Sequence, residues 1–172
     1  MLLVVETGQG LQNANSYISE SYVADKLPSA TMPEWNSLTI DEKNDRLVVA
    51  SQFIDISFQW IGKQKTLEQG LSWPRTGVVY QGHPIESDTI PNPIKRAVML
   101  ALILVIKNGI DYLRSTGEAQ VKREKMVIFE TEYFEGNKAD DVKTQYSDIN
   151  NILKGFYTMQ TGGIVTAEVL RA

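Results

Sequence analysis

Apolar positions between Thr39 and Gly62 recur every three to four residues and predict a long helix. Thr39 stands three residues before Glu42, which is the pattern of a capping box, so we expect the helix to begin there and run to about Trp60. One apolar stripe comprises Leu47, Ala50, Ile54, Phe58 and Ile61, and a neighbouring stripe comprises Val49, Phe53, Ile56 and Trp60. A surface this wide predicts packing partners on two sides, from the same chain or from a neighbouring subunit.

A second helix is predicted from Pro93 to Asn108, and it is apolar on nearly all sides. Asn92 and Pro93 are typical of an N-cap and a first helical position, and Gly109 is typical of a helix end. Because a helix without a polar face must be covered, we expect it at the centre of the fold.

Shorter elements surround these two helices. We expect a helix from Glu20 to Leu27, a loop with one turn near Trp35, and a last helix from Asp148 to Phe156 capped by Ser147. Alternation of apolar and polar residues from 125 to 134 predicts a half-buried strand. The segment 62–92 is dense in glycine and proline, which predicts a long loop with little regular structure.

The predicted fold is mainly α: a small helical bundle around the central apolar helix, with a β-strand or hairpin insertion and extended N- and C-terminal arms. The length of 172 residues fits one domain. We place this domain at residues 1–157, with an N-terminal arm at 1–16 and the long loop at 62–92. Residues 158–172 form the C-terminal arm, in which Ile164 to Leu170 has strand propensity but no partner nearby in the sequence.

Composition limits the chemistry. The chain has no cysteine, which excludes disulfides and thiolate chemistry, and one histidine, His83, which lies in a turn typical of a solvated loop. Gly8-Gln9-Gly10 lacks the third glycine of a dinucleotide loop. We therefore expect no catalytic residue, no metal ligand, no cofactor and no enzymatic activity. The longest apolar run, Ala97 to Ile106, is too short to span a bilayer, so no membrane association is expected.

The most unusual local sequence is Ser72-Trp73-Pro74-Arg75, which places a large apolar side chain in a loop. Trp73 either plugs the core and holds the loop against the helices, or anchors a contact with another subunit, since Trp and Arg are enriched at interface hot spots. Both roles can hold in an assembly.

Three stretches together carry a family resemblance: Val5-Glu6-Thr7-Gly8, Ala14 to Ile18, and Gly70 to Gly77 followed by Ile90-Pro91 and an apolar helix. They resemble head-to-tail connector proteins of tailed bacteriophages, and some relatives carry the label DnaT-like single-stranded-DNA-binding protein. The resemblance covers residues 4 to 156. Its most specific part is the Ser72–Arg75 block.

The resemblance implies a structural virion protein, assembled in the host cytoplasm. Such an adaptor forms a ring of its own copies, typically dodecameric, that joins the portal protein to the next neck or tail protein. The ring lines the channel for packaged and ejected double-stranded DNA without sequence-specific binding. The expected subunit and partner contacts comprise Phe53, Trp60, Trp73, Arg75, Ile164, Val165, Val169 and Leu170.

The alternative is a single-stranded-DNA-binding protein of the DnaT-like type. Such a protein needs a basic groove with stacking aromatic residues. Tyr112, Tyr133 and Phe134 are candidates for stacking, and the basic group Lys122, Arg123 and Lys125 is interleaved with Glu124. The net charge of −4 weighs mildly against tight nucleic-acid binding, and oligonucleotide titration discriminates the two hypotheses.

Overall fold

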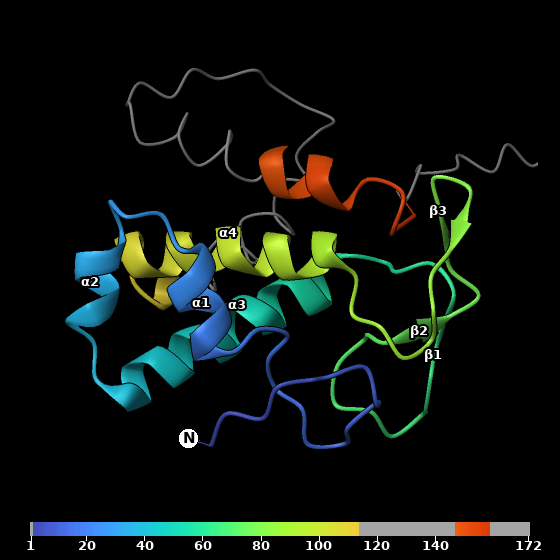
Figure 1. Cartoon of the computed structure of the whole chain (residues 1–172), viewed down its shortest axis with the longest axis horizontal. Helices are drawn as coiled ribbons and strands as arrows, with labels where there is room; N and C mark the ends of the chain where they lie inside the picture. Colours follow the sequence, from blue (N-terminus) through green and yellow to red (C-terminus); the bar gives the residue numbers. More distant parts are fainter. Residues whose placement is uncertain (1, 114–146, 159–172) are drawn as a thin grey trace, which may run out of the picture.

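Two long helices, α3 (Ile40–Ser57) and α4 (Asn92–Asn108), pack against each other at the centre of the computed structural model (Figure 1). The structure describes residues 2–113 and 147–158. Within these residues the fold is mainly helical with two small β-hairpins, which agrees with the predicted class. No helix in the described ranges is long and apolar enough to cross a membrane.

Helix α4 is central, as its sequence predicts. Its fully buried side chains are Ile94, Ala97, Val98, Ala101, Leu102, Leu104 and Val105. Each large one contributes roughly 1.5–3 kcal/mol through removal from water. Gly109 ends the helix with a φ of 89°, and its N–H donates to the carbonyl of Val105. The predicted start is one residue off, because Pro91 is the N-cap and Asn92 is already helical.

Helix α3 begins with the predicted capping box. The Thr39 N–H donates to Glu42 Oε2 at 2.8 Å, and the Glu42 N–H donates to Thr39 Oγ1 at 3.3 Å. The predicted end at Trp60 is wrong. The helix stops at Ser57 because the following residues become extended and Trp60 forms an antiparallel bridge with Tyr157, so tertiary pairing overrides the helical period.

Three further helical pieces cover this pair. They are α1 (Glu20–Lys26), α2 (Met32–Asn36) and residues 147–153. Figure 1 shows α1 crossing in front of the central pair, with the helical piece 147–153 along the upper side of α4. The last piece is shorter than predicted, because Gly155 takes a φ of 96° and turns the chain so that Phe156 is buried.

The segment between α3 and α4 has more regular structure than its glycine and proline content predicts. Strand β1 (Lys63–Gln64) pairs antiparallel with β2 (Arg75–Thr76), and β3 (Val79–Tyr80) pairs antiparallel with β4 (His83–Pro84). The observed hairpins therefore lie in this segment. The strand predicted at 125–134 and the predicted C-terminal arm lie outside the described residues.

The N-terminal residues fold back instead of forming the expected extended arm. Glu6 is buried, and its carboxylate accepts hydrogen bonds from the N–H groups of Gly8, Gly10 and Leu11 at 2.7–3.0 Å. Val5 also forms a parallel bridge with Ser16. A buried carboxylate with several N–H donors is a strong local restraint, so this loop closes on itself against the core.

Candidate functional site

The Ser72–Arg75 block lies inside the fold. Trp73 is fully buried, and its ring meets those of Trp60 and Phe156 edge-on at centroid distances of 5.9 and 5.8 Å. The peptide bond from Trp73 to Pro74 is cis. These contacts agree with the core-plug interpretation, in which Trp73 holds the loop to the helices.

Asp55, on α3, connects this block to the N-terminal loop. Its Oδ1 accepts hydrogen bonds from the Tyr17 hydroxyl and from the Ser72 N–H, the latter at 2.8 Å, and its Oδ2 accepts from the Ser72 hydroxyl at 3.2 Å. The Tyr17 oxygen in turn accepts from the Trp73 N–H at 3.1 Å. Three chain segments therefore meet at one carboxylate.

Burial raises the pKa of Asp55 above its ordinary value, against the opposing effect of its hydrogen bonds to Tyr17 and Ser72 and of the Arg75 charge. Burial also raises the pKa of the Tyr17 hydroxyl, and the neighbouring Asp55 charge adds to that effect. Perturbed pairs of this kind occur in active sites and in structural networks alike. Here every polar atom of the pair already contacts the protein, which is typical of a structural network.

Arg75 is used as a backbone clamp. Its guanidinium donates to the carbonyls of Ile61 at 2.7 Å, Gly62 at 2.8 Å, Ser72 at 3.0 Å and Trp60 at 3.4 Å. Burial lowers its pKa, and a guanidinium in a protein keeps its charge. Arg75 therefore holds residues 60–62, which follow α3, against the Ser72–Arg75 block.

The other residues expected at interfaces differ in burial, and some of them lie outside the described residues. Phe53 is buried and Trp60 is half-buried, whereas Ile164, Val165, Val169 and Leu170 lie outside the described residues. The subunit and partner contacts of all these residues stay predictions. Of the candidate DNA-contacting residues, only Tyr112 is described, and it is half-buried.

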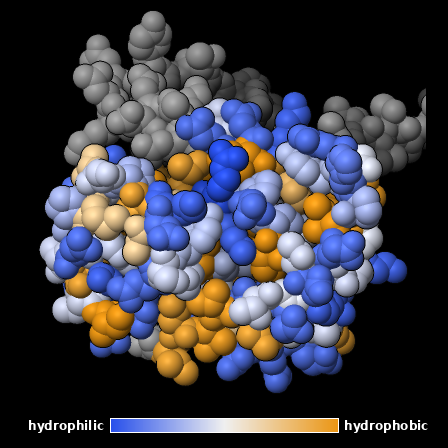
Figure 2. Space-filling model, in the orientation of Figure 1, coloured by the Kyte–Doolittle hydropathy of each residue, from blue (hydrophilic) through white to orange (hydrophobic). Residues whose placement is uncertain are grey.

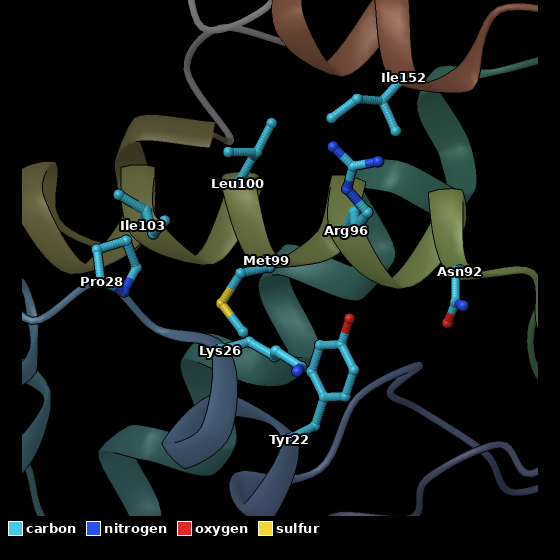
Figure 3. Close-up of a pocket in the computed structure, with 9 residues that line it drawn as sticks. All are labelled: Tyr22, Lys26, Pro28, Asn92, Arg96, Met99, Leu100, Ile103 and Ile152. Atoms are coloured by element: carbon cyan, nitrogen blue, oxygen red, sulfur yellow. The ribbon is translucent and has the colours of Figure 1, made fainter.

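A groove lies elsewhere, along the side of α4 that faces away from α3 (Figure 3). It has a volume of about 580 Å³. Helix α4 supplies five lining residues, and α1 and the piece 147–153 lie on either side. The described lining comprises Tyr22, Lys26, Pro28, Asn92, Arg96, Met99, Leu100, Ile103 and Ile152.

The groove combines apolar surface with positive charge. In Figure 3 the Arg96 guanidinium extends from α4 toward Ile152, while Tyr22 and Lys26 rise from α1 on the other side. The described lining contains these two cations and no carboxylate, although the whole chain has a net charge of −4. Figure 2 shows the same face, where polar and apolar side chains intermingle. Such a surface can hold a ligand with a flat apolar part and an anionic part.

Sequence reasoning missed this groove. The available signal is the spacing of Asn92, Arg96, Met99, Leu100 and Ile103, which places them on one face of α4. The sequence of α4 alone does not predict a groove, because the groove forms only where α1 and residues 147–153 flank this face. Within the described ranges no group of acidic residues and histidine could hold a metal ion, and His83 is exposed on β4.

Comparison with known proteins identifies the family. The model of the family described as "Putative DnaT-like ssDNA binding protein" matches residues 1–172, so the chain belongs to this family. No curated protein and no solved structure matches the chain. The DnaT-like part of the predicted resemblance is therefore confirmed at the level of the family, whereas the connector part has no support from these comparisons.

Proposed function

We propose that this protein binds single-stranded DNA. The observation that carries the proposal is membership of a family with that description over the whole chain. The groove beside α4 supports it, because sites for single strands combine cations that follow the backbone with aromatic side chains on which bases stack. The sequence leaves two functions open, a virion adaptor and a single-stranded-DNA-binding protein, and the proposal is the second of them.

The acidic net charge predicts how the binding behaves. A chain with a net charge of −4 gains little from nonspecific attraction to phosphate, so affinity depends on locally placed cations. We expect single strands to bind better than duplex, because only unpaired bases can stack on protein side chains.

Fluorescence anisotropy of a labelled oligo(dT) of about 16 nucleotides, a length that covers one typical site, tests the proposal. The expected result is saturable binding that weakens as salt rises and resists competition by duplex of equal length. Absence of binding even at low salt, or equal competition by duplex, would overturn it.

A structural virion role is the second candidate, and it rests on the resemblance of three stretches of the chain to phage connectors. The stretches that resemble phage connectors contact each other inside the fold: the Glu6 N–H donates to the Ser16 carbonyl at 2.8 Å, and the Trp73 N–H donates to the Tyr17 hydroxyl oxygen at 3.1 Å. The resemblance thus follows the residues that build this framework. Ile56 and Leu67 are more than 80% exposed, which suits contact with neighbouring subunits.

In this second hypothesis the protein is a non-enzymatic adaptor subunit of the virion neck, bound to the portal and to the next neck or tail protein. Light scattering of the protein alone and mixed with portal rings tests it. A ring that forms with portal, together with no affinity for oligonucleotides, would favour the adaptor over the single-stranded-DNA-binding function. No association with portal would count against it.

A further inference from the structure

We propose that the groove beside α4 holds one nucleotide unit of a single strand, with the base against Tyr22 and the apolar floor and the backbone phosphates at Lys26 and Arg96. This assignment rests on the proposed single-stranded-DNA binding and names its site.

The floor of the groove is apolar surface that the described chain leaves open. Leu100, Ile103 and Ile152 are each only half-buried, although α4 is apolar on nearly all sides. Helices of that kind are normally covered throughout. The volume of about 580 Å³ falls within the range of roughly 300–1,000 Å³ typical of small-ligand sites, which is enough for a nucleotide.

The two cations of the groove are available to a ligand. Neither Lys26 nor Arg96 forms an ion pair or a side-chain hydrogen bond with another described residue, and both are exposed. Two cations elsewhere are engaged, by contrast: Lys43 pairs with Glu20 at 3.0 Å, and Arg75 binds four carbonyls. Two unpaired cations from different elements, facing one groove without a carboxylate, complement two successive phosphates better than a neutral ligand.

The remaining polar groups suit a base. Tyr22 is half-buried at the side of the groove, so its ring is already partly ordered and offers a face for stacking. Asn92, the first residue of α4, is exposed at the groove and carries both a donor and an acceptor for a base edge. Stacking tolerates any base, so we expect weak sequence preference.

Variants of the full chain, titrated with labelled oligo(dT) over a range of salt, test the assignment. Lys26→Gln and Arg96→Gln should each weaken binding severalfold and reduce the slope of log affinity against log salt by about 0.7, the value for one lost phosphate contact on a single strand. Tyr22→Ala should weaken binding by about five- to a hundredfold without changing that slope, and Tyr22→Phe should bind like the wild type.

Lys63→Gln is the matched control, because Lys63 is an exposed cation on β1 and does not line the groove. It should leave affinity and salt slope unchanged. Circular dichroism checks that each variant is folded. If wild type binds and the groove variants behave like Lys63→Gln, the assignment is wrong and the site lies elsewhere, while the proposed function stands. If wild type does not bind the oligonucleotide, the assignment of the groove and the proposed function are both wrong.

Discussion

Replacing Asp55 by alanine should lower the free energy of unfolding by about 2–6 kcal/mol. The substitution leaves two donors, the Tyr17 hydroxyl and the Ser72 N–H, without their acceptor. Each donor that loses its partner inside the protein costs roughly 1–3 kcal/mol, and the two losses add. The Ser72 hydroxyl also loses an acceptor but can rotate toward water, so we assign no further loss to it.

Asp55→Asn is the informative partner variant. Its side-chain oxygen can still accept from Tyr17 and from the Ser72 N–H, and its amide can donate to the Ser72 oxygen. It also removes a charge that burial disfavours. We therefore expect a change of less than about 1 kcal/mol at neutral pH, well below that of the alanine variant.

The stability of wild type and that of Asp55→Asn should also depend differently on pH. Because burial raises the pKa of Asp55, the folded state keeps this proton at pH values where the unfolded chain has lost it. The resulting stabilisation is complete below the unfolded pKa of about 3.9 and is lost as pH rises through the folded pKa. The advantage of wild type over Asp55→Asn should therefore shrink as pH rises above about 4.

Urea denaturation of the three proteins, followed by circular dichroism at several pH values, measures these differences. An alanine variant within about 0.5 kcal/mol of wild type would refute the claim that Asp55 joins three segments, since surface substitutions produce changes of that size. An advantage of wild type that grows with pH would refute the direction of the pKa shift.

Six further substitutions, at Trp73, Gly8, Glu6 and the control position Gly82, test other parts of the framework by the same assay. Trp73→Ala should cost about 3–5 kcal/mol, while Trp73→Phe should cost clearly less, because the indole N–H has no hydrogen-bond partner among the described residues. Gly8→Ala should cost more than about 3 kcal/mol, since a Cβ would lie 1.7 Å from the Asp88 carbonyl oxygen. Gly82→Ala, also at positive φ but with nothing within 4 Å, should cost only about 1–2 kcal/mol; equal losses at the two glycines would contradict the close approach. Glu6→Gln should be less stable than wild type and more stable than Glu6→Ala, because one amide oxygen can replace only part of the carboxylate's three hydrogen bonds; equal stability of all three would show that the clamp contributes nothing.

The helices could be predicted from local signals. The capping box at Thr39, the apolar sequence of α4 and the end at Gly109 each depend on residues within a few positions. The end of α3 could not be predicted, because it depends on the bridge from Trp60 to Tyr157, almost a hundred residues away. The folded N-terminal loop was missed for a similar reason, since the role of Glu6 appears only once its carboxylate is seen among backbone N–H groups.

The candidate site was likewise predicted only in part from the sequence. Composition excluded thiol chemistry and disulfides, and the unusual local sequence directed attention to the Ser72–Arg75 block. The block's residues then proved to contact Asp55, Trp60 and the backbone around Gly62. The groove beside α4 joins residues of three separate elements, so no single stretch of sequence carries its pattern.

Photocrosslinking tests the central claim most directly. An oligonucleotide in which bromodeoxyuridine replaces thymidine is bound to the full chain, irradiated, and the modified peptides are identified by mass spectrometry. The account predicts crosslinks on α1 and α4, at Tyr22 and neighbouring groove residues such as Met99, because these side chains line the proposed base site. Crosslinks confined to other segments, or none under conditions where the oligonucleotide is bound, would contradict it.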